Sequence, residues 1–222
     1  AAAMDPTADL TVFAPTDAAF EAVLAVLGKE SIDDIPEALL NEIVSYHILG
    51  TSVTSDQLEN GDVETILPGE SVTVDLTDGV KINNANVGPA DLKAVNGVAH
   101  VVDAVLLPSY VAYSVGTIAE VVLFEKDFTI LAGALRKADL LETVATTPNL
   151  TVFAPDNAGF VAAGITSLDD FTAEELAPVL TYHVLGAVVK AADLPANGMA
   201  TTLNGGMIYL GYLNQGRVLI NG

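Results

Sequence analysis

The peptide LTVFAP occurs twice, at Leu10–Pro15 and Leu150–Pro155, and this repeat constrains the fold more than any other feature of the chain. The longer blocks LTVFAPTDAAF and LTVFAPDNAGF are identical at eight of eleven positions. The copies begin at residues 10 and 150, a spacing far above the ~20–50 residues of stacked repeat units, so each copy can enclose its own core. The sequence therefore predicts two homologous domains in tandem.

Each block is typical of a strand, a turn and the start of a helix. Apolar residues alternate with threonine, as in a half-buried strand, and Pro15 or Pro155 then removes a backbone donor. Side-chain oxygens follow at Thr16-Asp17 and at Asp156-Asn157, where they can cap a short helix.

A second matched pair, Tyr46-His47 and Tyr182-His183, follows the two blocks. Apolar residues precede each histidine at helical spacing, so each histidine is expected on an apolar helix face. The two stripes are Leu40, Ile43, Val44 and His47, and Leu176, Val179, Leu180 and His183. A buried ring needs a hydrogen-bond partner, which favours a structural histidine; a ligand-binding or catalytic histidine is the alternative.

The second half of each copy is expected to be rich in β-structure. Alternating apolar residues flank Asp78-Gly79 in the first copy and residues 213–216 in the second, which predicts a hairpin in each. The first copy continues through Asn96-Gly97 into a buried strand up to Leu107, and the second has no counterpart. Helical patterning over residues 113–148 precedes the second block alone.

This alignment places domain 1 at residues 1–108 and domain 2 at residues 109–222. Domain 1 is expected to lack N-terminal helices and domain 2 to lack a C-terminal strand block. Residues 1–6 have neither a basic start nor an apolar stretch, so any export signal is expected outside the chain given.

Composition narrows the classes of partner. The net charge of −21 disfavours nucleic acids and anionic membrane surfaces. Cysteine is absent, which excludes disulfides and thiolate chemistry, and no apolar run approaches the ~20 residues of a membrane span.

Motifs for catalysis or for cofactors are missing from the sequence. There is no nucleophile elbow, phosphate-binding loop, dinucleotide glycine pattern or zinc-protease motif, although Ser45 and Thr181 flank the Tyr-His pairs. Asp33-Asp34 and Asp169-Asp170 are expected to face helix N-termini rather than to form a catalytic pair, and Asn149 is expected to be an unmodified turn residue despite its glycosylation triplet. The sequence thus predicts no enzyme, no cofactor and no metal site.

The order of LTVFAPTDAAF, SYHILG and NGVAHVVD in the first copy, and of LTVFAPDNAGF and TYHVLG in the second, resembles the fasciclin domain. That resemblance implies an α+β fold, in which each domain is a β-wedge of two sheets with several packed helices. It also implies a role in extracellular adhesion and, as interaction residues, Tyr46, His47, Tyr182 and His183. Residues 91–95 match a further adhesive motif of the family poorly, and no Arg-Gly-Asp occurs.

Three hypotheses for function follow. The first is a non-enzymatic adhesion or protein-interaction module, secreted or displayed at a cell surface, that binds protein or matrix partners or itself. The alternative is a structural subunit of a head-to-tail extracellular filament or matrix, completed by neighbouring chains. A third is a protein that binds a small molecule or polysaccharide between its domains.

Overall fold

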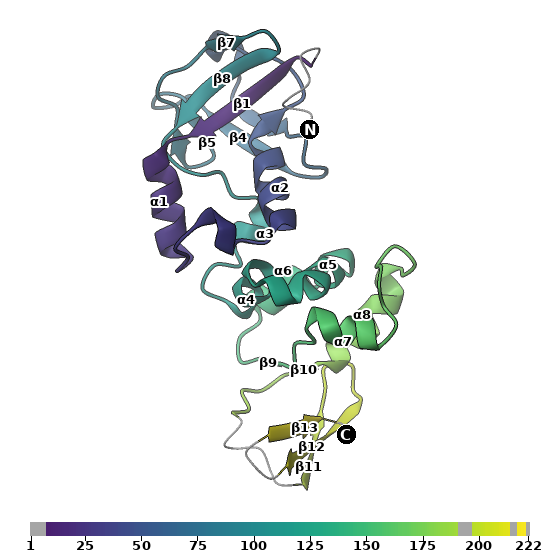
Figure 1. Cartoon of the computed structure of the whole chain (residues 1–222). Helices are drawn as coiled ribbons and strands as arrows, with labels where there is room; N and C mark the ends of the chain where they lie inside the picture. Colours follow the sequence, from purple (N-terminus) through teal and green to yellow (C-terminus); the bar gives the residue numbers. More distant parts are fainter. Residues whose placement is uncertain (1–7, 191–196, 214–216, 221–222) are drawn as a thin grey trace. The chain divides into compact units, whose positions relative to one another are not determined.

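The computed structural model describes residues 8–190, 197–213 and 217–220, which form two compact units (Figure 1). Unit 1 is Ala1–Ala112 and unit 2 is Tyr113–Gly222. The boundary expected from the sequence falls just before helix α3 (Ser109–Ala112), the last element of unit 1. Both units combine helices with β-sheets, which confirms the α+β class.

Unit 1 contains two four-stranded sheets, with strand orders β2-β1-β8-β7 and β3-β4-β5-β6. Before α3 its elements are β1 (Leu10–Pro15), α1 (Asp17–Val26), η2 (Ile32–Asp34), α2 (Glu37–Tyr46), β2 (Ile48–Leu49), η3 (Ser55–Gln57), β3 (Gly61–Glu64), β4 (Ser71–Asp75), β5 (Lys81–Ile82), β6 (Ala85–Asn86), β7 (Leu92–Ala94) and β8 (Gly97–Val102). Strands β1 and β8 are far apart in sequence but lie side by side in parallel (Figure 1).

The LTVFAP block of unit 1 folds as its sequence predicts. Its strand β1 buries the side chains of Leu10, Thr11 and Phe13, and the chain leaves the sheet after Pro15. The Thr16 hydroxyl then accepts a hydrogen bond from the backbone N–H of Ala19 and caps α1. Such a cap satisfies a donor that the first helical turn leaves unpaired.

The second sheet of unit 1 contains the predicted hairpin. Val74 of β4 pairs with Ile82 of β5, and the turn between the strands places Gly79 at a φ of 81°. Val72, Val74 and Ile82 are at most 1 % exposed, so this sheet buries one apolar face.

Unit 2 begins with helices and ends with strands. Its elements are α4 (Ile118–Phe124), η4 (Lys126–Phe128), α5 (Thr129–Lys137), α6 (Leu141–Thr146), β9 (Thr151–Val152), α7 (Asn157–Ala162), α8 (Ala173–Tyr182), β10 (Val184–Leu185), β11 (Asn197–Thr201), β12 (Met207–Leu213) and β13 (Arg217–Ile220). The sheets are β10-β9 and β11-β12-β13. The second LTVFAP block thus forms a much shorter strand than the first, whereas Asp156 caps α7 as expected.

The predicted hairpin of unit 2 is also present. Leu213 of β12 pairs with Arg217 of β13, and the expected turn at residues 214–216 lies outside the described residues. Helices α4, α5 and α6 confirm the helical patterning before the second block, with Leu131 and Leu135 buried on α5.

Two sequence predictions for unit 1 need correction, and in unit 2 Val179 of the predicted apolar stripe is likewise 51 % exposed. On α2 the buried residues are Leu39, Ile43 and Tyr46, while Val44 is 55 % exposed. The buried face of α2 is therefore rotated by about one residue from the face that the sequence predicted. The strand expected to run up to Leu107 ends at Val102, because only the residues up to Val102 pair with β1.

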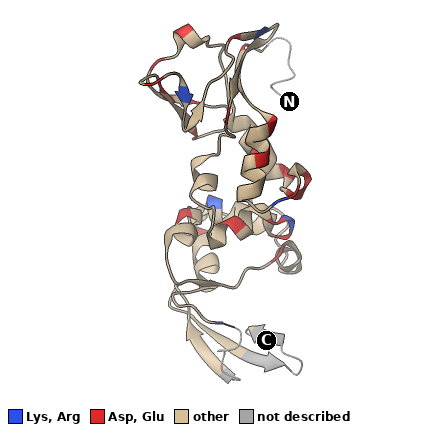
Figure 2. Cartoon of the chain, turned by 90° about the vertical axis from the view of Figure 1, so that its left-hand side faces the viewer, with Lys and Arg blue, Asp and Glu red and all other residues tan. Residues whose placement is uncertain are grey.

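Asp and Glu residues occur at many separate places along the ribbon of both units (Figure 2). Within the described residues, no helix has both the length and the hydropathy to cross a membrane. The same residues contain no group of three or more His, Asp or Glu side chains arranged to hold a metal ion.

Candidate functional site

In unit 1, Tyr46 and His47 lie at the junction between α2 and β2 and are buried. The Tyr46 hydroxyl donates to the Ser71 carbonyl at 2.8 Å and accepts from the Asn83 side-chain amide at 3.0 Å. Burial raises the pKa of Tyr46 above its ordinary value, and the hydrogen bond from Asn83 opposes this. Tyr46 therefore ties helix α2 to the second sheet.

Both ring nitrogens of His47 have backbone partners. Nδ1 lies 2.7 Å from the Ile43 carbonyl, and Nε2 accepts from the backbone N–H of Leu106 at 2.9 Å. Since Nε2 is an acceptor, the ring is neutral with its proton on Nδ1. Burial lowers the pKa of His47, and the bond to Ile43 works in the opposite direction. These contacts confirm a structural histidine in unit 1.

In unit 2, Tyr182 and His183 occupy the same place between α8 and β10. The Tyr182 hydroxyl donates to the Met207 carbonyl at 2.9 Å, and His183 Nδ1 lies 2.8 Å from the Val179 carbonyl. The two rings meet edge to face, with centroids 6.2 Å apart. Unlike their counterparts in unit 1, both side chains are only partly buried.

A cavity of about 480 Å³ borders the Tyr-His pair of unit 2. It is lined by Phe153, Ala154, Pro155, Tyr182, His183, Ile208 and Ile220. Most of these residues are apolar, and the histidine adds a polar group. Clefts of this size with a few polar groups are typical of binding sites. The sequence named Tyr182 and His183 but gave no sign of the cavity.

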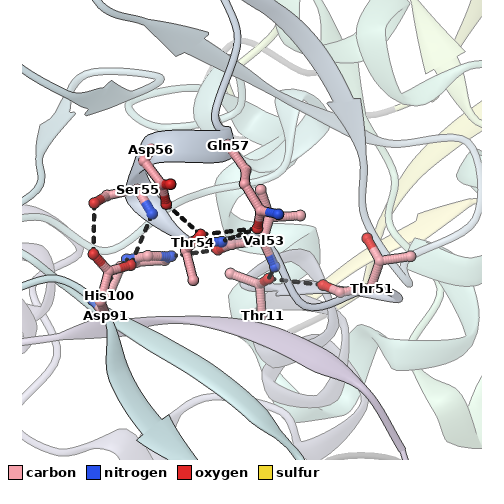
Figure 3. Close-up of polar contacts among 9 residues, drawn as sticks. All are labelled: Thr11, Thr51, Val53, Thr54, Ser55, Asp56, Gln57, Asp91 and His100. Atoms are coloured by element: carbon pink, nitrogen blue, oxygen red, sulfur yellow. Dashed lines mark hydrogen bonds and ion pairs between the residues drawn. The ribbon is translucent and has the colours of Figure 1, made fainter.

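A second polar cluster, in unit 1, joins residues that the sequence did not connect (Figure 3). The backbone N–H and the hydroxyl of Ser55 both donate to the Asp91 carboxylate, at 2.7 and 2.6 Å. These bonds hold the pKa of Asp91 below its ordinary value. Asp91 adopts a φ of 58°, which Asp tolerates better than most residues.

His100 contacts the same cluster from strand β8. Its Nδ1 accepts from the Asp91 N–H at 3.3 Å, and its Nε2 donates to the Val53 carbonyl at 2.9 Å (Figure 3). Val53 in turn donates to the Thr11 hydroxyl of β1 at 2.8 Å. The cluster therefore links β1, β8 and the segment before η3.

The cluster contains serine, histidine and aspartate but has no catalytic geometry. A catalytic triad needs the serine hydroxyl on the histidine and the aspartate behind it. Here Ser55 donates to Asp91, and both His100 nitrogens are engaged with backbone groups. Ser45 and Thr181, which flank the Tyr-His pairs, donate to carbonyls of their own helices. Among the residues that the structure describes, no serine or threonine hydroxyl is hydrogen-bonded to a histidine.

Asp34, Asp169 and Asn149 take part only in local structure, at a helix start or in a turn. Asp34 accepts from the N–H of Ser31 in a capping box at η2, as expected for an acidic residue at a helix start. Asp169 accepts from the Ser167 hydroxyl in a turn, which differs from the helix N-terminus that the sequence predicted for it. Asn149 has a φ of 61°, consistent with a turn residue.

The model of the fasciclin domain matches residues 2–108 and 126–222. The chain therefore belongs to the fasciclin domain family and carries two copies of the domain.

Relatives match over different extents of the chain. Protein sll1483 of Synechocystis sp. is 39 % identical over 48 % of this chain and 59 % of its own length. Human periostin is 26 % identical over 90 % of this chain and 24 % of its own length. The cell surface glycolipoprotein MPB83 of Mycobacterium bovis is 28 % identical over 45 % of this chain and 44 % of its own length. The chain thus spans only part of these relatives.

One solved structure that matches is the FAS1 domain pair of the insect cell adhesion molecule Fasciclin I. The match covers 96 % of this chain and 79 % of the chain in that structure, with 17 % sequence identity and a TM-score of 0.39. At that score the likeness carries no structural argument.

Proposed function

We propose that the chain is a non-enzymatic, extracellular module that acts by binding other proteins, as in cell or matrix adhesion. Membership of the fasciclin family supports the proposal, as does the lack of a hydrogen bond between a hydroxyl and a histidine among the described residues. MPB83 is named a cell surface protein, and we extend that location to this chain.

The observation that carries the proposal is the cavity beside Tyr182 and His183. It offers apolar side chains and a partly exposed histidine to a partner. Tyr46 and His47 are only 3 % and 6 % exposed, so they could reach a partner only after a local change in structure. We therefore propose Tyr182 and His183 as the contact residues and assign Tyr46 and His47 a supporting role.

Solid-phase binding of the tandem to cells, to matrix proteins and to itself tests this proposal. Ala154→Glu places a charge in the cavity, and we expect it to weaken binding by about 10-fold or more. Ala158→Glu is the matched control, because Ala158 is also exposed in unit 2 but does not line the cavity. Absence of saturable binding to every partner, or equal binding by both variants, would contradict the proposal.

The head-to-tail assembly remains a second candidate function, favoured by one observation. Among the described residues, β9 pairs only with β10, so its other edge has no described partner strand. An open edge is a template for a further strand, and a contact between unlike surfaces propagates when its rotation does not close. Light scattering over a range of concentrations tests this, and a chain that stays monomeric at high concentration would remove the assembly.

A further inference from the structure

The hairpin sheets of the two units differ in the side chains on their outer face, the face away from the buried one. In unit 1, Asp62 of β3 lies opposite Thr73 of β4, and the Thr73 hydroxyl donates to the Asp62 carboxylate at 2.6 Å. In unit 2, Met199 of β11 lies opposite Tyr209 of β12. Residues opposite each other in an antiparallel pair share one face of the sheet. A polar pair in unit 1 is thus replaced by an apolar pair in unit 2.

The exposure of this face does not depend on the blocks that distinguish the two units. Unit 1 contains the strand block after its hairpin, and Ser71 and Thr73 are exposed there. Unit 2 contains the helices before its LTVFAP block, and Met199 and Tyr209 are 57 and 63 % exposed. The segment between β2 and β3 is described in unit 1, where it leaves β3 at the edge of its sheet. Each of these parts leaves the face accessible in the unit where it is described.

Strand β11 is also an edge strand, and its outward backbone groups can be identified. In the order β11-β12-β13, only β12 pairs with β11 among the described residues. The Thr202 N–H donates to the Gly206 carbonyl at 2.8 Å, and the direction of such bonds alternates along an antiparallel pair. The N–H and C=O groups of Met199 and Thr201 therefore face away from β12. These groups form a template for a further strand.

Charge distinguishes this edge from its counterpart in unit 1. Strand β3 carries Asp62 and Glu64, whereas β11, with the sequence NGMAT, has no charged residue. Charged side chains on an edge strand oppose pairing, and like charges directly opposite each other are destabilising. In a chain with a net charge of −21, an edge without charge is where a second copy meets the least repulsion.

We propose that two copies of this chain associate through β11, which pairs antiparallel with β11 of the second copy about a two-fold axis at Met199. The two three-stranded sheets then form one continuous sheet. Met199 lies opposite Met199 of the second copy, and Tyr209 flanks this pair on each side, so one apolar row crosses the junction. A two-fold contact uses the same surface twice and closes at a dimer. The inference is independent of the proposed function, because the surface includes neither Tyr182 nor His183.

Sedimentation equilibrium of the full chain over a range of concentrations measures the association. We expect a reversible equilibrium between monomer and dimer with a Kd on the order of 0.1 mM, because the contact is small. Raising the salt concentration from about 0.05 M to about 0.5 M should tighten the dimer, since salt screens the repulsion between two acidic chains. The backbone and apolar contacts do not depend on that repulsion.

Met199→Asp gives β11 the charge that Asp62 gives β3. It should weaken the dimer at least about 10-fold, because two carboxylates would then lie opposite each other. Val188→Asp is the matched control, since Val188 is 60 % exposed in unit 2 and lies outside β11 and β12. The same charge at that position should leave the dimer unchanged.

Cysteine substitutions test the register, because the chain has no cysteine of its own. Met199→Cys places two thiols opposite each other across the axis, at a Cα separation of about 5.5 Å that a disulfide spans. Thr201→Cys lies on the same face of the same strand, but the residue opposite it is residue 197 of the second copy. Under oxidation we therefore expect covalent dimers from Met199→Cys and none from Thr201→Cys.

The outcomes separate this inference from the proposed function. A chain that stays monomeric at roughly 1 mM, association that Met199→Asp leaves unchanged, or equal cross-linking of the two cysteine variants overturns the inference. Loss of binding to cells or matrix in Met199→Asp, with the chain itself monomeric, would identify another protein as the occupant of β11 and would also overturn it. If a monomeric chain binds cells or matrix and Ala154→Glu weakens that binding, the proposed function stands.

Discussion

The LTVFAP blocks and Tyr-His pairs of the two units make the same local hydrogen bonds in different surroundings. The Thr11 hydroxyl donates to the Thr51 carbonyl at 2.7 Å, and Thr151 donates to Ala187 at 2.7 Å. The tyrosines reach the first residue of the following hairpin in both units, at 2.8 and 2.9 Å. These contacts thus form in both units.

The burial of the Tyr-His pair, in contrast, differs between the described residues of the two units. His47 is buried and bonded at both nitrogens, while His183 is partly exposed beside a cavity. The comparison teaches that one motif is a structural element in unit 1 and an accessible surface in unit 2. Four changes, taken in order of expected effect, test this view.

Gly97→Val should have the largest effect, with a loss of about 4 kcal/mol or more from the stability of unit 1. The added Cβ would lie 1.9 Å from the Leu10 carbonyl oxygen, and the backbone holds a φ of 141°. Gly61→Val is the control, since Gly61 has a φ of 131° but no atom within 4 Å of an added Cβ. Chemical unfolding measures both, and equal losses would mean that backbone strain alone decides, not the contact between β1 and β8.

His47→Ala should destabilise unit 1 by about 2–3 kcal/mol, because it leaves the Leu106 N–H and the Ile43 carbonyl unpaired in the interior. His183→Ala should cost unit 2 only about 0.5–1 kcal/mol, because water can reach the Val179 carbonyl in its place. Hydrogen exchange resolved by residue gives the two values separately. Equal losses of stability in the two units would contradict the difference between the buried His47 and the accessible His183.

The stability of unit 1 should fall as the pH drops below 6.5. Burial lowers the pKa of His47 in the folded state, so below its ordinary value of 6.5 the unfolded chain binds a proton that the folded chain does not. The loss should reach at most about 1.4 kcal/mol per pH unit and should end below the folded-state pKa. Urea unfolding at pH 7 and pH 5 measures it. His47→Gln should reduce the pH dependence, and an unchanged slope would assign the effect to other groups.

The smallest effect is expected at the helix caps, where the units should respond alike. Thr16→Ala and Asp156→Ala each remove the side chain that accepts from an N–H of the first helical turn. Each should cost about 1 kcal/mol in its own unit. Thermal unfolding followed in each unit provides the check, and a large difference would show that the caps also depend on the surroundings.

The structural histidines were predictable because the contact lies within one helix. Nδ1 bonds the carbonyl four residues earlier in both units, a distance that helical spacing fixes. The exposure of Val44 was not predictable in this way, because Leu40, Ile43 and Val44 fit a helical stripe as well as the buried set does. The choice between the two sets was made by packing against other elements.

His100 belongs to the NGVAHVVD block, but its contact with Ser55 and Asp91 had no signal in the sequence. Its members come from three separate segments, and neither Asp91 nor Ser55 belongs to a recurring motif. The left-handed backbone at Asp91 becomes evident only in the folded chain.

By itself the sequence determined the tandem repeat, the strand, turn and capped helix of each block, the hairpins and the place of each histidine at the end of a helix. These features depend on neighbours within about one helical turn or one hairpin. Only the tertiary structure decided which distant groups bond to the buried Tyr46-His47 pair, because Ser71 and Leu106 lie far from it in the sequence. Such pairing is set by packing across the whole unit, and local spacing does not encode it.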